Sequence, residues 1–492
     1  MELSILLFCI FLLLFIVKLF THCSSSTKTP PGPKGYPIIG SLFDLGPRPN
    51  QSLAALAKIH GPIMTVKLGS LTTIVASSPE TAKEILQKQQ QIFSDRTVPD
   101  VIAAQPNLEG TLAWVPRDHV WRNRRRICNT HMFTTQKLDS LQHLRHAKVE
   151  ELVLYIKEKS AKGAPIDIGR AAFATTLNLI SNMIFSIDMV DSEFENAHEF
   201  RDLVRRITEG GGKPNLSDYF PLIKWLDVQG VKRRVIPAYK RLHVIFDQVI
   251  AKRLEDRELG ESRKDDFLDV LLDQCEEEGS GFNRETIKAL ILNLFLAGSD
   301  SSAITTEWAM AELLRKPEAM QKLREEIIQK IGFERSVKES DIGQLPYLQA
   351  VVKETMRLHP AAPLLLPYKA TKNTQIFGFT IPKNSQVLVN AWAIGRDPNH
   401  WENPISFLPE RFLVSNLDYK GWDFEYIPFG AGRRICPGMP LAIRMVNLML
   451  ASIIQAFRWR LPDGTTKENL DMEEQFGVAL TKAVPLCAIP YI

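Results

Sequence analysis

The stretch 284–315 is the feature that most limits how this chain can fold. Its first half is apolar on almost every helical face, at Ile287, Leu290, Ile291, Leu292, Leu294, Phe295 and Leu296. A helical pattern longer than about 25 residues usually indicates a coiled coil or a membrane span, and this one fits neither. Because a helix that is apolar all round has to be buried, we expect it to run through the centre of a large domain.

Helical patterns dominate the rest of the chain. They cover 135–160, 233–257, 318–330, 346–359 and 441–457, whereas strand-like stretches such as 63–68 and the proline-punctuated end 459–492 flank them. A length of 492 residues alone would favour two or three domains. No second linker, repeat or low-complexity run interrupts 41–492, so we predict one continuous domain, mainly α with small β-sheets (α+β).

The N-terminal segment differs from this body. Residues 3–20 are apolar except for Ser4 and Lys18, and as a helix they would be roughly 27 Å long, close to the ~30 Å of a bilayer core. No basic region precedes them, which favours a transmembrane anchor over residues 1–21 rather than a cleaved signal peptide. The prolines of 29–37 enforce extended backbone, so we expect 22–40 to be a stiff hinge between membrane and body.

Cysteine use and charge narrow the environment of the body. Six scattered cysteines are too few for a disulfide scaffold, which favours a reducing compartment and a body that faces the cytoplasm. The sequons at Asn50 and Asn215 are then expected to be empty. A net charge of +4 gives no nucleic-acid footprint.

The loop 429–438 carries the strongest chemical signal, and it reads Phe-Gly-Ala-Gly-Arg-Arg-Ile-Cys-Pro-Gly. Its glycines, Gly432 and Gly438 among them, let backbone approach a flat ligand. Cys436 precedes a helix-like run, and a helix N-terminus favours thiolate. A lone cysteine is more often a buried structural residue, but here the full pattern Phe-x-x-Gly-x-Arg-x-Cys-x-Gly is present.

That pattern resembles the cytochrome P-450 superfamily, and the resemblance covers nearly the whole chain. It implies the cytochrome P-450 fold as one unit, haem b with Cys436 as iron ligand, and Phe429, Gly432 and Gly438 against the haem. A thiolate ligand favours O–O cleavage, which is monooxygenase chemistry. Arg434 is placed to meet an anionic propionate.

Two further motifs agree with the resemblance. Glu354 and Arg357 share a helix face; alone they would be read as a surface ion pair, but the resemblance implies a buried network with Arg411. In 297–302, Asp300 and Ser301 supply an acid and an alcohol that can relay protons. Relatives usually place Thr after the acid, and the glycine beside these hydroxyls could widen the helix.

The motif Trp-x-x-x-Arg places Trp121 and Arg125 against haem propionates. Arg122, Arg124 and Arg126 form a basic cluster that could dock an acidic redox partner, although a solvated helix face is the alternative. Tyr368 stands where relatives usually have an Arg that serves a propionate, so no propionate role is assigned to it.

The closest resemblance is to plant microsomal members, especially the geraniol and terpenoid hydroxylase family, on the motifs 391–397, 427–432 and 470–477. It implies a substrate pocket lined by Leu294, Ala297, Ala362, Leu364, Phe476 and Val478, which suits a small apolar terpenoid. We therefore expect hydroxylation with O2 and electrons from NADPH-cytochrome P-450 reductase, in the endoplasmic reticulum membrane. Alkaloid or aromatic amino-acid derivatives as substrates, a reductase-independent isomerase or dehydratase, and a non-catalytic haem carrier remain alternatives.

Overall fold

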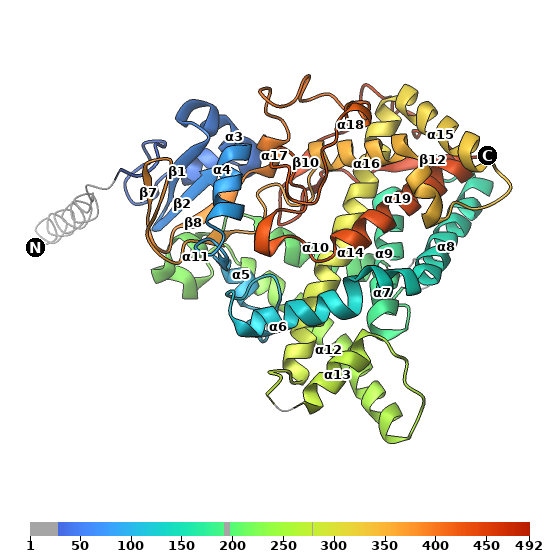
Figure 1. Ribbon diagram of the computed structural model, residues 1–492, viewed down its shortest axis with the longest axis horizontal. Helices are drawn as coiled ribbons and strands as arrows, with labels where there is room; N and C mark the ends of the chain where they lie inside the picture. The colour runs from blue at the N-terminus through green and yellow to red at the C-terminus, as the bar shows by residue number, and fades with distance from the viewer. Residues whose placement is uncertain (1–27, 191–196, 278) are drawn as a thin grey trace, which may run out of the picture.

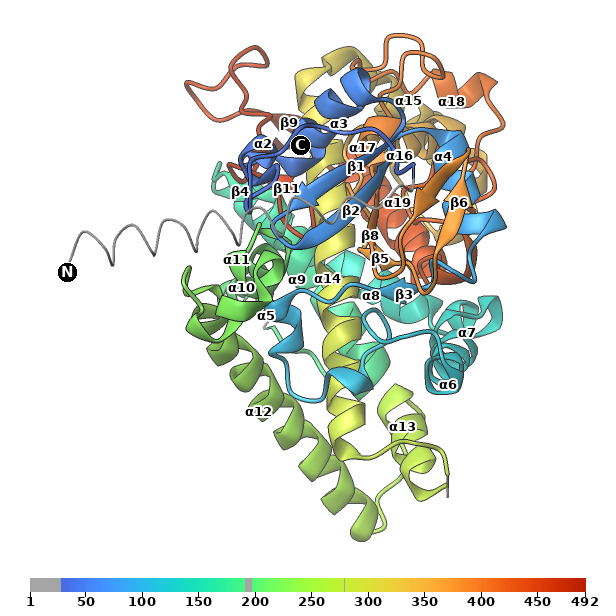
Figure 2. The same ribbon diagram turned by 90° about the vertical axis from the view of Figure 1, so that its left-hand side faces the viewer.

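A long helix, α14 (Arg284–Arg315), runs through the middle of the protein, and other helices pack around it (Figures 1 and 2). The structure is a computed structural model that describes residues 28–492 except 191–196 and 278. Asn283 caps α14 by accepting from Thr286 N–H, and Pro317 follows its end. As the all-round apolar pattern predicts, Ile287, Leu290 and Leu292 are fully buried.

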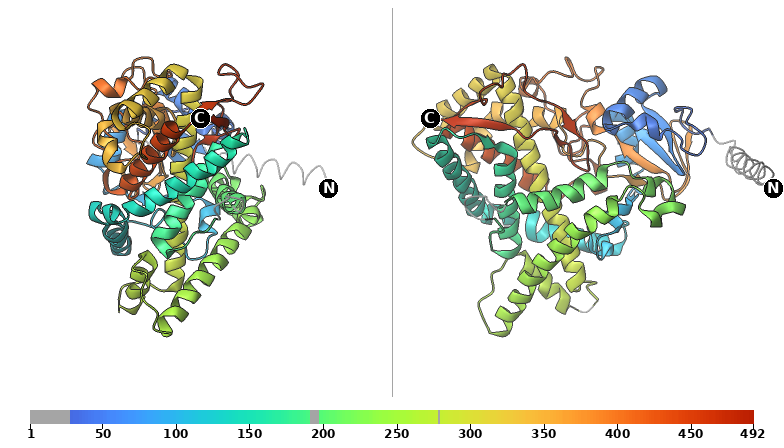
Figure 3. Two further views of the ribbon diagram at one scale, coloured as in Figure 1. Left: turned by 90° about the vertical axis from the view of Figure 1, so that its right-hand side faces the viewer. Right: turned by 180° about the vertical axis from the view of Figure 1, so that it is seen from behind.

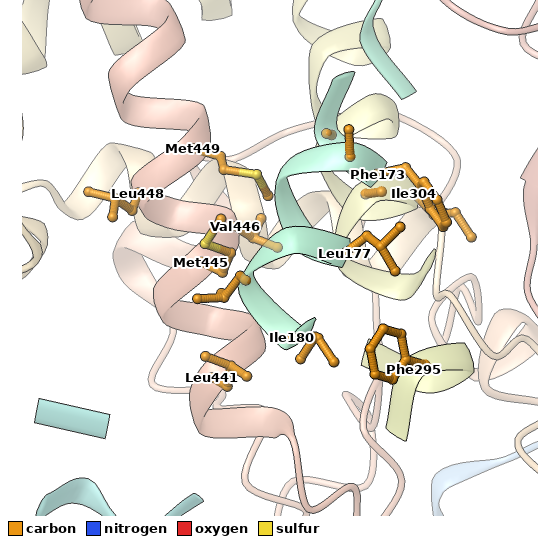
Figure 4. Packing of buried hydrophobic residues seen from close by; sticks show 14 of the residues in the cluster. Phe173, Leu177, Ile180, Phe295, Ile304, Leu441, Met445, Val446, Leu448 and Met449 are labelled. Carbon is orange, nitrogen blue, oxygen red and sulfur yellow. The ribbon is translucent and has the colours of Figure 1, made fainter. Parts of the chain in front are cut away.

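Two helices lie along α14 and complete the centre of the core. They are α9 (Ile168–Phe185) and α19 (Met439–Ala456). Figure 4 shows Phe173, Leu177 and Ile180 of α9 between side chains of α19 and those of α14. Residues of these three helices line part of the main cavity of the protein.

The remaining helices form an irregular shell, most of it on the side away from the large sheet (Figure 3). The longer ones are α3 (Pro49–His60), α6 (His119–Cys128), α7 (Thr135–Ser140), α8 (Gln142–Ala161), α10 (Ala197–Gly212), α12 (Val231–Glu258), α13 (Phe267–Glu276), α15 (Pro317–Ile331) and α16 (Pro346–Leu358). The short ones are α2 (Leu42–Leu45), α4 (Pro79–Lys83), α5 (Asp100–Ala103), α11 (Leu216–Tyr219), α17 (Ala391–Ile394) and α18 (Arg411–Val414).

The strands are short and lie at the flanks. The largest sheet has the order β1-β2-β8-β5-β3, from Ile63–Leu68, Leu71–Ala76, Gln386–Val389, Tyr368–Lys369 and Asp95–Arg96. A second has the order β4-β12-β9, from Ile166–Asp167, Cys487–Tyr491 and Arg458–Arg460. Two hairpins pair β6 with β7 (Thr374–Ile376, Phe379–Ile381) and β10 with β11 (Glu474–Gln475, Thr481–Lys482). The predicted class, mainly α with small sheets, is confirmed.

The structure differs from the predicted elements in two ways. The stretch 135–160 is two helices, because the chain turns at Leu141 between α7 and α8. The helices α9, α10 and α13 (Phe267–Glu276) were not predicted. Sixteen of the 18 residues of α9 are buried, so it presents no polar face and therefore no helical period.

The N-terminal predictions fall partly outside the described residues. The expected anchor, 1–21, and the first part of the hinge lie there. From Pro31 onward the hinge packs onto the body: Pro31 O accepts from Thr65 N–H, and Gly40 pairs with Leu68. A side chain at Gly32 would overlap the carbonyl of Thr65.

Two helices of the described residues, α14 and α19, are long and apolar enough to span a membrane. Two-thirds of the apolar window of each is buried inside the protein, so both are core helices. The sequon residues Asn50 and Asn215 are also buried, at 0% and 1% exposure. A glycan would not fit on either side chain in the folded protein, so their empty state would carry no information about topology.

Candidate active site

A cavity of about 330 Å³ lies between α14 and the loop that carries Cys436. Its walls are mainly apolar and come from segments far apart in the sequence. Most of the predicted site residues line it: Trp121, Arg125, Leu294, Ala297, Asp300, Ser301, Ala362, Phe429, Arg434, Cys436, Gly438 and Val478. The tertiary structure thus brings together motifs that the sequence separates by more than 300 residues.

Cys436 is held by its loop at the start of α19. Its N–H donates to Phe429 O at 3.0 Å, which closes the loop. Burial raises the pKa of the Cys436 thiol, while the N–H groups of Gly438 and Met439 and the charge of Arg125 act to lower it. The expected preference for thiolate at a helix N-terminus is therefore outweighed by desolvation, and a bound metal ion, which deprotonates a coordinating thiol, has to complete it.

Three arginines line the same cavity, and this is the observation that tests whether haem fits. Arg96, Arg125 and Arg434 all contact it, and none forms an ion pair with a carboxylate of the described residues. Desolvation lowers the pKa of each guanidinium, that of Arg434 to about 9. Buried cations without counter-ions are costly, so the residues present suit a flat, largely apolar group that carries carboxylates, as haem does.

The guanidinium of Arg434 is anchored by backbone carbonyls. It donates to Ser94 O at 2.9 Å, to Leu112 O at 3.3 Å and to Val115 O at 2.6 Å. Its plane also lies 4.4 Å from the ring centre of Trp121, whose indole N–H donates to Leu112 O. The side chain of Arg125 makes no hydrogen bond with the described residues, so of the predicted propionate contacts it has the most freedom to turn to a ligand.

Three predicted residues lie elsewhere. Gly432 does not line the cavity; it has a φ of +66° and a side chain there would meet Leu86 O, so its role is to let the loop pack on the segment Glu84–Lys88. Leu364 and Phe476 line a smaller neighbouring cavity of about 140 Å³ instead. The two cavities share Leu365, Leu366 and Val478 in their walls, so Leu364 and Phe476 lie beside the main cavity rather than in its wall.

The predicted relay lies on the opposite wall, in an uninterrupted stretch of α14. Ser301 Oγ donates to Ala297 O at 2.8 Å, and Thr305 Oγ1 donates to Ser301 O at 2.9 Å. The hydroxyls therefore bond back to the preceding turn, and the expected widening of the helix is not found. Gly298 instead lets Ile180 approach, because a Cβ there would lie 2.9 Å from its side chain.

Asp300 is in an unusual position for a carboxyl group, since it lines two cavities. One is the main cavity, and the other is a small polar one of about 30 Å³ that also contacts Arg201, Glu307 and Lys482. Burial raises the pKa of Asp300 to about 6, although Arg201 and Arg205 pull it down. The small cavity has room for one or two water molecules. Asp300 is therefore placed to exchange protons between the small cavity and the main cavity.

The Glu354–Arg357–Arg411 network is closed in the structure. Arg357 Nε donates to Glu354 Oε2 at 2.7 Å, and Arg411 Nε donates to Glu354 Oε1 at 3.1 Å. Glu354 and Arg357 have fully buried side chains. The reading as a surface ion pair is therefore wrong.

The basic cluster near Trp121 is smaller than predicted. Arg122 and Arg126 are exposed, but Arg124 is buried and donates to Glu109 O. Helical periodicity explains this, because Arg124 lies on the face of α6 that also carries Trp121 and Cys128. Two of the three residues remain available to a partner.

Five polar residues of the cavity wall were not predicted from the sequence: Arg96, Thr176, Thr208, Asn293 and Thr305. Arg96 stacks 4.3 Å from the ring centre of Tyr368 and donates to Ala113 O and Leu366 O, and so places a cation where Tyr368 has none. Asn293 accepts from Leu112 and Ala113 N–H. Neither Arg96 nor Asn293 belongs to a motif; only the break that Asn293 makes in the continuous apolar run of α14 could have singled it out.

Comparison with known proteins agrees with this geometry. Residues 30–486 match the family model described as Cytochrome P450. The chain is 48% identical to geraniol 8-hydroxylase of Catharanthus roseus, over 97% of each chain. It is also 47% identical to 7-ethoxycoumarin O-deethylase of Helianthus tuberosus, over 94% of each chain.

A third relative is drimenol monooxygenase of Persicaria hydropiper, at 43% identity over 100% of this chain and 97% of that protein. The cysteine loop, the buried network and a match that spans nearly the whole chain lead to one conclusion. The protein belongs to the cytochrome P450 family and is a haem-thiolate monooxygenase.

Proposed function

We propose that this protein hydroxylates a small, largely apolar terpenoid, using haem b, O2 and electrons from NADPH-cytochrome P-450 reductase. The observation that carries the substrate class is the main cavity, whose exposed wall is mostly apolar around Leu294, Ala297, Ala362 and Val478. Two similar proteins are named for terpenoid substrates, geraniol and drimenol. Apolar walls discriminate weakly between substrates of similar size, so the class is better supported than any one compound.

In this proposal Cys436 is the iron ligand, and haem so bound supplies the oxygen activation. Arg125 and Arg434, joined by Arg96, face the propionates and neutralise them. The indole ring of Trp121 stacks against the guanidinium group of Arg434 and helps to hold it in place. Phe429 and Gly438 border the cavity beside the cysteine.

Asp300 and Ser301 handle protons in the proposed mechanism. A carboxyl with a pKa near 6 can both hold and release a proton at neutral pH. The carboxyl of Asp300 takes a proton from water in the small cavity, and the hydroxyl of Ser301, the next residue, hands it on into the main cavity. Because Ser lacks the methyl group of Thr, its hydroxyl is less restricted in rotamer.

An aromatic substrate is the second candidate. The relative named 7-ethoxycoumarin O-deethylase is 47% identical to this chain, which is close to the identity of the geraniol relative. An alkaloid or aromatic amino-acid derivative would enter the same cavity. The cavity walls do not choose between a terpenoid and a flat aromatic ring, so turnover has to.

We further propose that the protein sits in the endoplasmic reticulum membrane through residues 1–21, as a single-pass protein with its body in the cytoplasm. Leu222 and Trp225 are exposed at 89% and 80%. They lie close to the start of the described chain, because Ser70 N–H donates to Tyr219 O and the neighbouring Gly69 N–H donates to Ile39 O. Large apolar side chains exposed there suit contact with lipid. Arg122 and Arg126, near the cysteine side, offer positive charge to an acidic reductase.

Purified holoprotein tests the proposal directly. The reduced, carbon-monoxide-bound difference spectrum should show a thiolate-ligated haem, and Cys436→Ala should lose it, whereas Cys487→Ala, at an exposed cysteine, should keep it. Turnover of a terpenoid and aromatic panel, with and without reductase, then identifies the reaction. Product formation without reductase would contradict the hydroxylase proposal and indicate an isomerase or dehydratase. No turnover with any compound would indicate a haem carrier.

A further inference from the structure

Asn293 is the one residue of the apolar part of α14 that brings an amide into the main cavity. Its Oδ1 accepts two hydrogen bonds, from Leu112 N–H at 3.1 Å and from Ala113 N–H at 3.0 Å. Both donors belong to the loop that forms the facing wall, and all three residues line the cavity. The amide oxygen therefore holds this loop against α14.

These two bonds also fix the orientation of the amide. An oxygen and a nitrogen of an amide are often exchanged in structures, but two N–H donors can only meet the oxygen. The Nδ2 group, with its two N–H donors, then has to point elsewhere. It has no acceptor among the described residues, and it is not among the polar atoms that packing seals off.

Four hydroxyl groups in the wall of the cavity already have a hydrogen-bond acceptor of their own. The hydroxyls of Thr176, Thr208, Ser301 and Thr305 each donate to a backbone carbonyl. Filling the cavity with a pure hydrocarbon would strip water from the Asn293 amide without replacing its hydrogen bond, which is costly. A site with such a donor strongly prefers a ligand that supplies an acceptor.

We infer that Asn293 is a specificity-determining residue that donates a hydrogen bond to an oxygen of the substrate, so that the substrate is an already oxygenated small molecule rather than a hydrocarbon. This inference rests on the proposed function and narrows its substrate class. The class of reaction that supplies the substrate must then leave a hydroxyl, ether or carbonyl oxygen on it.

The position of Asn293 also predicts where that oxygen lies. Asn293 precedes Ser301 by eight residues, so at about 1.5 Å per residue it is roughly 12 Å away along the axis of α14. An extended carbon chain advances about 1.2 Å per bond, as extended backbone does. The bound oxygen is therefore held many bonds away from the carbon presented beside Ser301, and the oxidation takes place at the far end of the molecule.

The matched variant is Asn293→Asp, because a carboxylate keeps the acceptor for Leu112 and Ala113 N–H but removes the donor. Substrate-induced spectral shifts of the ferric holoprotein at pH 8 give dissociation constants for two probes, geranyl methyl ether, whose oxygen can only accept a hydrogen bond, and the hydrocarbon myrcene. Asn293→Asp should weaken binding of the ether by about tenfold and change myrcene binding by less than about twofold. An equal change for both probes would overturn the inference.

A measurement on the unaltered protein covers the case in which the variant fails to fold. Geranyl methyl ether keeps an acceptor oxygen but has no hydroxyl proton, so it should bind about as tightly as geraniol, and myrcene should bind about tenfold more weakly. If all three bind alike, Asn293 does not select for oxygen and the inference fails, while turnover of any of them still supports the proposed function. If none binds or turns over, the terpenoid proposal itself fails.

Discussion

Two sets of buried charges in this protein are treated in opposite ways. In the network around Arg357, the guanidinium meets Glu354 at 2.7 and 2.8 Å and also donates to Pro404 O at 2.7 Å and Ser406 O at 3.1 Å. In the main cavity, the guanidinium groups of Arg96 and Arg434 donate only to neutral carbonyls, and the side chain of Arg125 has no hydrogen-bond or ion-pair partner among the described residues.

The difference separates charges that serve the fold from charges that serve a ligand. A buried ion that has its own counter-ion is complete without any bound molecule, so its role ends with the structure. A buried cation without a counter-ion keeps a high free energy until a ligand supplies the negative charge. The unpaired arginines of the cavity thus predict a ligand that carries negative charge. Variants of the two sets of charges should therefore differ in whether they lower stability or ligand binding.

Removing the counter-ion from the network should be the most damaging change. Glu354→Gln leaves Arg357 charged and fully buried beside a neutral amide, which is expected to cost about 3 to 5 kcal/mol of the free energy of unfolding. The holoprotein yield, read from the carbon-monoxide difference spectrum, and the midpoint of thermal unfolding should both fall. Lys322→Gln is the control, because its pair with Glu410 is exposed and should be worth less than about 1 kcal/mol; equal losses in both variants would contradict the comparison.

Asp300→Asn should lower the activity of the protein but raise its stability at neutral pH. Turnover should fall by about a hundredfold or more, because the proposed proton donor is lost. The folded state holds the Asp300 proton more tightly than the unfolded state, so this carboxyl destabilises the protein as the pH rises from about 4 to about 6 and above.

Thermal unfolding of this variant checks the sign. At pH 7.5 Asp300→Asn should be more stable than the original protein by the order of 2 kcal/mol, and near pH 4 the gain should vanish. A stability gain that is the same at both pH values would show that the charge of Asp300 is not its cause.

Arg125→Gln should affect the ligand and spare the fold. Since Arg125 is a buried cation without a counter-ion, removing its charge should not destabilise the haem-free protein and should stabilise it by about 1 kcal/mol or less. Haem retention, measured by transfer to excess apomyoglobin, should weaken by about tenfold, as for the loss of one charged hydrogen bond. Destabilisation of the haem-free form comparable to that of Glu354→Gln would place Arg125 with the fold instead.

Ser301→Thr is the smallest expected change. It adds a methyl group that restricts the hydroxyl rotamer while Oγ1 can still bond to Ala297 O. The amount of product formed per NADPH oxidised should rise by less than about threefold, while the carbon-monoxide difference spectrum and the thermal stability stay unchanged. A fall in that fraction would show that the free rotation of Ser301 is useful in this protein.

Much of the fold could be predicted because its signals are local. The helix 284–315 and the strand 63–68 have the bounds that the sequence predicts, since apolar periodicity and caps act within a few residues. The helix α9 could not be predicted, because burial on all sides erases its period. The place of Gly432 depended on Leu86, a distant residue that no local pattern specifies.

The sequence by itself determined the family chemistry: a single cysteine in a glycine loop, an acid and an alcohol in a long apolar helix, and a glutamate and arginine three residues apart. The tertiary structure decided which charges are paired and which remain open, since Arg96 and Asn293 acquire their meaning only from backbone groups that folding brings beside them. The physical reason is that covalent neighbours fix helices and turns, whereas the free energy of a buried polar group depends on every atom within hydrogen-bond reach, and most of those come from elsewhere in the chain.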